Sequence, residues 1–330
     1  MIHPENKIYF DGSHYIAIPH TEGKKRRQKD PEEKVEVIER SKSPPNSISP
    51  ESAELQKIVP TFFVDEKPEP IMATKSEIFN DIYAEARELP RQHRKEYIID
   101  NMRPYFDTDI DLETYVNEKI INKRKNVLQR KTRFIRKAYM NDFNYFATFT
   151  YDSKKLDEQT FRKKLSMCLS TFQKRKGWRY MGVWERAPQT KRLHFHCLLL
   201  VPKDTMPGEM ITVRDYNTKE KRMQESIQNT YFNDRFGRSD FEEIGTTEYD
   251  LSRSLAYIMK YIEKSGEKIV YSRGLPMYMI SDINDKDVIC HFGIEDKKMI
   301  LTDEFTCYDY GEELGPFSDK VKKLLRKTSS

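Results

Sequence analysis

The chain has 330 residues, of which 37% are hydrophobic and 34% charged, and its formal net charge is +5. This length and composition allow one large folded domain or two modest ones. Four cysteines without any CxxC spacing argue against a disulfide framework and against a cysteine-built zinc site. No apolar run approaches the roughly 18 residues of a membrane span, and the N-terminus lacks the apolar stretch of a secretory signal, so we expect a cytoplasmic protein.

The first 142 residues read as an arm followed by helices. Residues 1–20 predict two short strands around the turn signal Asp11-Gly12. Residues 21–75 are rich in Pro, Ser, Glu and Lys and predict disorder. Helical spacing then predicts one helix from Ser76 to Pro90 and a second from Leu112 to about Ala138.

From residue 143 the pattern changes to a mixture of strands and helices. Strands are predicted at 144–151, 178–184, 192–201, 241–245 and 269–271, and helices at 157–176, 222–232 and 249–264. The β-α-β-β-α-β order predicts an α+β fold in which helices back an antiparallel sheet. After about Asp282 the signals are weak, apart from a short basic helix at 319–327.

Positive charge is concentrated in the second helix. Between Lys119 and Lys137 there are nine Lys or Arg and no acidic residue, a pattern that favours binding to polyanions such as DNA. A solvated helix face would explain the same pattern equally well. The candidate DNA-binding residues are Lys123, Arg124, Lys125, Arg130, Lys131, Arg133, Arg136 and Lys137.

Two histidines, His194 and His196, flank Phe195 in a predicted strand. Side chains two residues apart in a strand point to the same face, so both imidazoles can share one metal ion. Glu185 ends the preceding strand, and a hairpin would bring its carboxylate beside them. Two His and one carboxylate suit Mg²⁺ or Mn²⁺, although a pair of structural histidines is the commoner explanation of the motif alone.

A second motif follows in the helix at 249–264. Tyr257 and Tyr261 are four residues apart and therefore lie on one helix face, with Lys260 and Lys264 on an adjoining face. Tyrosine is a poor nucleophile near neutral pH because its pKa is near 10, and neighbouring lysines and a metal ion would favour its phenolate. An amphipathic helix with packed aromatic side chains is the alternative explanation.

Taken in this order, three motifs resemble those of the HUH (His-hydrophobe-His) rolling-circle replication initiators, the Rep proteins of plasmids and single-stranded DNA phages. The resemblance lies in 146–151 (FATFTY), 192–196 (RLHFH) and 257–264 (YIMKYIEK), and the two tyrosines are similar to the microvirus-type variant. Residues 271–276, which include Arg273, also resemble a segment that follows the tyrosine helix in phage-type Reps. The resemblance covers about residues 143–276.

The resemblance implies an HUH endonuclease domain of ferredoxin/RRM-like fold and a specific chemistry. A divalent ion on His194, His196 and Glu185 would polarise the scissile phosphate of single-stranded or cruciform origin DNA. Attack by Tyr257 or Tyr261 would leave a 5′-phosphotyrosyl link and a 3′-hydroxyl that primes a host DNA polymerase. The sequence contains no G-x-x-x-x-G-K-[ST] motif, so we expect no nucleotide cofactor and a host helicase in a bacterial or phage-infected cell.

Other classes fit the residues less well. A HIT-type hydrolase needs a third His where Leu198 stands, and a cupin needs a Glu where Leu200 and Val201 stand. A transposase or mobilisation relaxase of the same superfamily remains an alternative, as does a non-catalytic DNA-binding protein with a Rep-like fold. The predicted segments are a largely disordered arm (1–75), a helical basic DNA-binding extension (76–142), the endonuclease domain (143–282) and a C-terminal extension (283–330).

Overall fold

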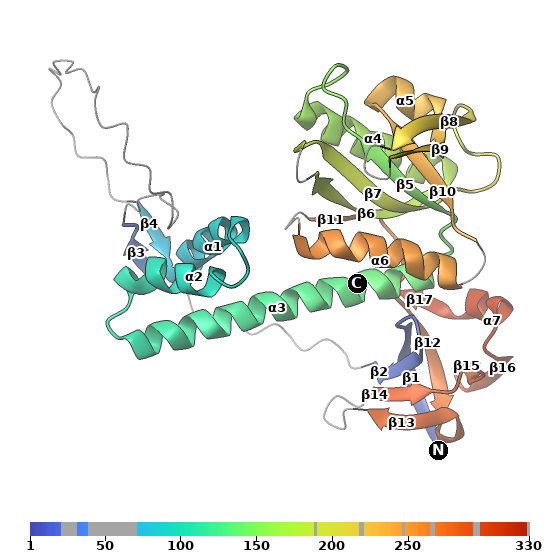
Figure 1. Ribbon diagram of the computed structural model, residues 1–330. Coiled ribbons are helices and arrows are strands. Elements are labelled where there is room, and N and C mark those ends of the chain that lie inside the picture. The colour runs from blue at the N-terminus through green and yellow to red at the C-terminus, as the bar shows by residue number, and fades with distance from the viewer. Residues whose placement is uncertain are drawn as a thin grey trace, which may run out of the picture. The chain divides into compact units, whose positions relative to one another are not determined.

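The computed structural model describes residues 1–20, 32–38, 71–187, 190–217, 221–245, 248–264, 268–292 and 298–328 (Figure 1). The chain divides into two compact units, a smaller one of Lys24–Lys125 and a larger one of Met1–Gly23 with Asn126–Ser330. Antiparallel strands and helices occur together in both, which confirms the predicted α+β class. Among the described helices, none is long and apolar enough to cross a membrane.

The smaller unit packs helices beside a two-stranded sheet. Thr74 begins α1 with a capping box, because its hydroxyl accepts from the Glu77 N–H while the Glu77 carboxylate accepts from the Thr74 N–H. The core includes Phe79 of α1, Met102 of α2 and Val116 of α3. The elements are β3 (Lys34–Glu36), β4 (Met72–Thr74), α1 (Lys75–Glu85), η1 (Ala86–Glu88), α2 (Arg94–Met102), η2 (Arg103–Tyr105) and the start of α3 (Asp109–Met140).

Both helices predicted from residue 76 onward are confirmed as α1 with η1 and as α3. The disorder predicted for residues 21–75 falls mostly outside the described residues. Within that segment, Lys34–Glu36 and Met72–Thr74 pair as antiparallel strands.

The larger unit contains a seven-stranded antiparallel sheet in the order β11-β6-β7-β5-β10-β9-β8. Helices α4 and α5 cover one face, and α6 lies on the other together with the C-terminal part of α3 (Figure 1). These elements are β5 (Tyr145–Thr150), α4 (Glu158–Lys176), β6 (Arg179–Arg186), β7 (Leu193–Leu200), β8 (Met210–Asn217), β9 (Arg222–Asn229), α5 (Thr230–Phe236), β10 (Ser239–Glu243), α6 (Glu248–Lys264) and β11 (Ile269–Tyr271).

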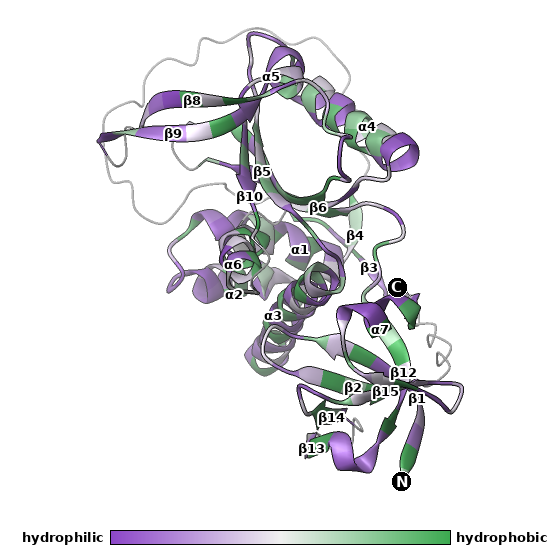
Figure 2. Ribbon diagram, turned by 90° about the vertical axis from the view of Figure 1, so that its right-hand side faces the viewer, coloured by the Kyte–Doolittle hydropathy of each residue, from purple (hydrophilic) through white to green (hydrophobic). Residues whose placement is uncertain are grey.

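One helix predicted in this part is wrong. Residues 222–229 form β9, which pairs with β8 from Met210 opposite Asn229 to Asn217 opposite Arg222, and the helix α5 begins only at Thr230. Figure 2 shows the β8–β9 ribbon extending away from the rest of the sheet. Cross-strand pairing with β8 therefore overrides the helical propensity of this segment.

A second sheet in the larger unit joins the two ends of the chain. The predicted N-terminal hairpin is confirmed as β1 (Ile2–Phe10) and β2 (Tyr15–Pro19), and β1 lies between β2 and β12. The remaining elements are β12 (Tyr278–Asn284), η3 (Asp285–Asp287), β13 (Val288–Phe292), β14 (Lys298–Leu301), β15 (Thr306–Asp309), β16 (Glu312–Pro316), α7 (Asp319–Leu324) and β17 (Arg326–Thr328). The sequence analysis had divided these strands between an N-terminal arm and a C-terminal extension.

Candidate active site

Three neighbouring strands, β6, β7 and β5, present polar side chains to the face of the sheet that α6 covers. Strand alternation explains the division of β7, whose Leu193, Phe195, Cys197 and Leu199 are buried in the core beneath α4. His194 and His196 consequently face α6. The β6–β7 hairpin places Glu185 directly opposite His194, as the sequence predicted.

Gly182 permits the close approach of β6 to β7. A Cβ at this position would lie 2.4 Å from the His196 carbonyl oxygen and 2.5 Å from the Cys197 Cβ. Contacts this short with backbone and core atoms cannot be relieved by moving one side chain. The glycine therefore helps to fix the register that brings Glu185 beside the histidines.

Each imidazole is held by a threonine of β5. The Thr148 hydroxyl lies 3.0 Å from Nδ1 of His196, and the Thr150 hydroxyl lies 3.1 Å from Nδ1 of His194. A hydroxyl can donate or accept, so it can serve either tautomer of its partner ring. These bonds orient the rings and leave Nε2 of each as the nitrogen available to a ligand, as outer hydrogen bonds do in metal sites.

Glu185 interacts most closely with His196. Its Oε2 lies 2.9 Å from His196 Nε2, and both side chains are largely buried. A carboxylate only accepts, so in this arrangement His196 Nε2–H donates and Nδ1 is free to accept from the Thr148 hydroxyl. Binding of a cation at Nε2 would reverse this pattern, with Nδ1–H then donating to Thr148.

The rings of His194 and His196 are nearly parallel, with centroids 5.9 Å apart. An ion with metal–nitrogen bonds of about 2.1 Å joins two nitrogen atoms at most about 4.2 Å apart, so the rings would have to turn toward each other to share one. Within the described part of the chain, no group of three or more His, Cys, Asp or Glu is arranged to hold a metal ion. The donor chemistry of the two imidazoles and the carboxylate nevertheless fits a divalent cation.

Burial lowers the pKa of His194, with a smaller contribution in the same direction from His196. The lowered pKa favours the neutral imidazole, which is the form that can coordinate a cation. His194 is therefore prepared to act as a ligand near neutral pH.

Helix α6 brings both tyrosines over the histidines. Ile258 and Ile262 are buried against the sheet and anchor the helix. The Tyr261 ring stacks on the His196 ring with a centroid distance of 4.7 Å, and the Tyr257 ring meets it edge-on at 5.4 Å. The predicted pair of tyrosines and pair of histidines thus lie in direct contact.

The two tyrosines differ in their surroundings. Tyr257 is 40% exposed, whereas Tyr261 is half-buried. Burial raises the pKa of Tyr261 well above its usual value, and a hydrogen bond with Tyr257 and the charge of Glu185 raise it further. A hydrogen bond that favours neutral Tyr261 is one in which its hydroxyl donates to Tyr257. Tyr257 is therefore the more accessible hydroxyl, and it receives a proton donor.

One aromatic side chain of this face was missed by the sequence analysis. Phe146 of β5 lies parallel to His196 at 6.3 Å and edge-on to Tyr257 at 5.7 Å. The alternation of β5 could have revealed it, since Phe146 precedes Thr148 and Thr150 on the same face. It closes the apolar side of the site beneath Tyr257.

The predicted basic residues are scattered and differ in exposure. Lys260 is exposed on α6, while the Lys264 side chain lies outside the described residues. Arg273 is exposed, and its backbone carbonyl accepts from Gln173 and Arg179. The structure therefore brings none of these cations into a described contact with the histidines.

The cations of α3 divide into exposed and structural residues. Arg124, Lys125 and Arg133 are exposed, and Lys123, Arg130 and Lys131 are partly buried. Arg136 forms an ion pair with Asp11, and Lys137 is 5% exposed and donates to the Leu275 carbonyl. The last two are therefore engaged in packing the end of α3 within the larger unit.

Comparisons with known proteins bear on the region that carries this site. No curated protein and no solved structure gives a significant match to the chain. Residues 144–266 match the model of a family of replication-associated proteins, the ORF2 type. The matched segment runs from β5 through α6 and contains the histidines, the tyrosines and Glu185. The part of the chain that carries the site is therefore similar to rolling-circle replication initiator proteins.

Proposed function

We propose that this chain initiates rolling-circle replication by nicking and rejoining single-stranded origin DNA through a tyrosine. The observation that carries the proposal is the contact of two histidines of β7 with two tyrosines of α6, at centroid distances of 4.7 and 5.4 Å around His196. Packing alone does not require a carboxylate and two hydroxyl-bonded imidazoles beneath a pair of tyrosines. The match to replication-associated proteins over the same residues supports the same reading.

Tyr257 is proposed as the first nucleophile. Its oxygen attacks the scissile phosphorus, the phosphorus–O3′ bond breaks, and the departing O3′ takes up a proton to become a 3′-hydroxyl. The DNA then remains joined to the protein through a 5′-phosphotyrosine, whose bond energy allows rejoining without ATP. The greater exposure of Tyr257, and the hydrogen bond it accepts from Tyr261, favour it over Tyr261 for the first attack.

Tyr261 has two proposed roles. Its hydroxyl donates to Tyr257 and so stabilises the developing phenolate, as hydrogen bonds to a charged form do. When Tyr257 is occupied by DNA, Tyr261 is the remaining hydroxyl on the same helix face and can make the second attack that closes a circle. Lys260, exposed on α6, is proposed to contact a phosphate oxygen of the bound strand.

His194, His196 and Glu185 are proposed to hold Mg²⁺ or Mn²⁺. When bound, such an ion would polarise the scissile phosphate. Thr148 and Thr150 keep the Nδ1 atoms engaged so that both Nε2 atoms can turn to a shared cation. A host polymerase extending the 3′-hydroxyl and a host helicase opening the duplex complete the proposed process.

The test is the formation of a covalent protein–DNA adduct. The protein is incubated with Mn²⁺ and single-stranded DNA from its own replicon, and the products are separated on a denaturing gel. We expect an adduct that disappears without Mn²⁺, in Tyr257→Phe and in His194→Ala/His196→Ala. Tyr216→Phe is the matched control, because Tyr216 is an exposed tyrosine of the β8–β9 ribbon.

Loss of the adduct in Tyr261→Phe with full retention in Tyr257→Phe would reverse the assignment of the nucleophile. If no adduct forms with either Mg²⁺ or Mn²⁺, the proposed chemistry fails. A non-catalytic DNA-binding protein would then be the better reading of the same fold.

A further inference from the structure

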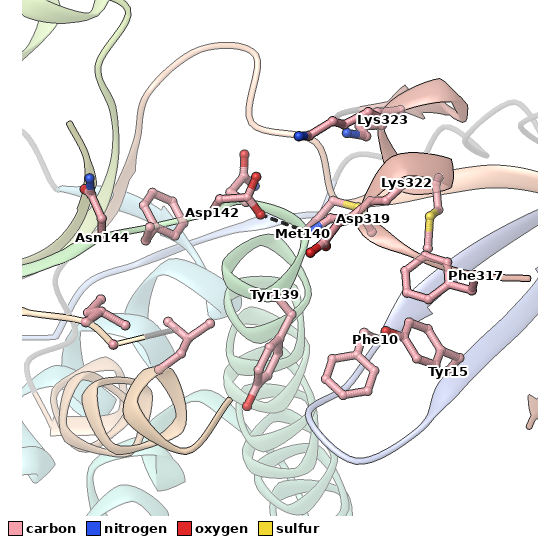
Figure 3. Close-up of a pocket in the computed structure, with 17 residues that line it drawn as sticks. Phe10, Tyr15, Tyr139, Met140, Asp142, Asn144, Phe317, Asp319, Lys322 and Lys323 are labelled. Atoms are coloured by element: carbon pink, nitrogen blue, oxygen red, sulfur yellow. Dashed lines mark hydrogen bonds and ion pairs between the residues drawn. The ribbon is translucent and has the colours of Figure 1, made fainter. Parts of the chain in front are cut away.

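A cavity of about 540 Å³ lies in the larger unit, away from the tyrosine site. The N-terminal hairpin, the end of α3 and the helix α7 all contribute to its walls (Figure 3). Its volume falls within the range of about 300–1,000 Å³ that is common for ligand sites. The proposed nicking chemistry uses none of its lining residues.

One wall of the cavity is aromatic. Phe10, Tyr15, Tyr139 and Phe317 line it, and their rings contact one another at centroid distances of 4.6 Å (Phe10–Tyr15), 4.9 Å (Phe10–Tyr139) and 4.8 Å (Tyr15–Phe317). Tyr15, Tyr139 and Phe317 are only partly buried. Mutual packing thus holds the rings in place while part of their surface borders the cavity.

The rim is basic. Lys322, Lys323 and Lys327 line the cavity, and Lys322 forms an ion pair of 3.0 Å with Asp142. Desolvation lowers the pKa of Lys327, and the nearby charges of Lys322 and Lys323 lower it further. The lysines are therefore close enough to repel one another, and an anion between them would relieve that repulsion.

We propose that this cavity binds one nucleotide of a single DNA strand, with the base on the aromatic wall and the phosphate between Lys323 and Lys327. In Figure 3, Lys323 and the aromatic side chains Tyr139, Phe10 and Tyr15 lie on opposite sides of the drawn residues. Aromatic rings combined with cations are the usual features of sites for unpaired nucleotides. A duplex offers no exposed base face, so the arrangement selects a single strand.

The cavity is also within reach of the proposed nicking site. Leu251, in the first turn of α6, lines the cavity, and Tyr257 follows six residues later. At 1.5 Å per residue, this separation is about 9 Å along the helix axis, or roughly three stacked nucleotides. The inference rests on the proposed function only in taking the polymer to be single-stranded DNA.

The experiment measures binding without catalysis. Full-length Tyr257→Phe protein is titrated against fluorescent dT12 in EDTA, and the affinity is followed by anisotropy over a range of salt concentrations. Lys323→Gln/Lys327→Gln should bind roughly 2- to 30-fold more weakly. Its salt slope should fall by about 0.7 for each phosphate that the variant no longer neutralises. The matched control is Lys320→Gln/Lys286→Gln, which removes the same charge from exposed lysines outside the cavity.

Crosslinking supplies a second readout. An oligonucleotide containing 4-thiothymidine should crosslink to peptides that carry Tyr139 or Phe317, and excess unlabelled 5′-dTMP should compete far less well than unlabelled dT12. Equal losses of affinity in the two lysine pairs, or crosslinks confined to other peptides, would overturn the proposal. Competition by 5′-dTMP as strong as that by dT12 would assign a free nucleotide and overturn the strand assignment.

The two proposals fail separately. If the wild-type protein forms the Mn²⁺-dependent adduct but the cavity variants bind like their controls, only the cavity proposal is lost. If dT12 binds through the cavity lysines but no adduct ever forms, the proposed nicking function is lost and the cavity proposal stands.

Discussion

Replacing the hydroxyls of Thr148 and Thr150 tests the role of β5 in the site. Valine has nearly the same shape as threonine but cannot hydrogen-bond, so Thr148→Val/Thr150→Val removes the partners of both Nδ1 atoms at 3.0 and 3.1 Å. Both residues lie on strand β5, where a β-branched side chain is favourable. The variant should therefore fold while its imidazoles lose their orientation.

The expected loss of cation affinity follows from the number of bonds removed. Each hydrogen bond contributes about 0.5–1.5 kcal/mol net, so the pair contributes about 1–3 kcal/mol. Converted at 1.36 kcal/mol per tenfold, this is a loss of roughly 5- to 160-fold. The range contains the loss of about 10–100-fold that removal of outer hydrogen bonds typically causes at metal sites.

Mn²⁺ affinity is measured by calorimetry on the full-length protein, with far-ultraviolet circular dichroism as a check on folding. Thr148→Ser/Thr150→Ser keeps both hydroxyls and should restore most of the affinity. Thr171→Val is the matched control, because the Thr171 hydroxyl bonds only locally to the Met167 carbonyl on α4. Wild-type Mn²⁺ affinity in the double valine variant would refute the argument that these hydroxyls position the rings.

Three further outcomes follow from the structure. Gly182→Ala forces a Cβ to within 2.4 Å of the His196 carbonyl oxygen, so the free energy of unfolding should fall by about 1–3 kcal/mol or more; an unchanged urea midpoint would contradict this. Burial lowers the pKa of His194, so the stability associated with its neutral form is present above the unfolded value of about 6.5 and is lost as the pH falls through the lower folded pKa. His194→Gln should accordingly lose less stability than wild type on acidification below about pH 6.5, and parallel denaturation curves would count against it. Lys137→Met should leave the salt dependence of DNA binding unchanged because Lys137 is buried, whereas Arg133→Gln should reduce the slope by about 0.7, as titrations of both variants would reveal.

The elements that carry the site could be predicted from the sequence because their patterns are local. Alternation in β5 and β7 separates the core residues from Thr148, Thr150 and the histidines, and the helical spacing of Ile258 and Ile262 fixes which side of α6 is buried. These two periodicities suffice to bring Tyr257 and Tyr261 toward the histidines. The difference between the tyrosines could not be predicted, since it depends on burial and on their mutual hydrogen bond.

The failed helix at 222–232 shows the limit of spacing arguments. Met223 and Ile227 are four residues apart, a separation that puts two side chains on one face of a helix and equally on one face of a strand. The choice was made by a partner, β8, which lay in a segment without a clear pattern. The second sheet was missed for a related reason, because β12 is buried along almost its whole length and shows no alternation.

The position of β1 has a consequence for the order in which the molecule can be built during synthesis. Its neighbour β12 begins at Tyr278, so about 270 residues must be added after β1 before that pairing can form. At about 5–20 residues per second, this delay is roughly 13–54 s. During that time Ile8 and Ala17 lack the partners that bury them in the finished sheet. The segment from β5 to α6 is completed earlier, so a growing chain can acquire its histidines and tyrosines in a folded sheet before its first strand has found its place.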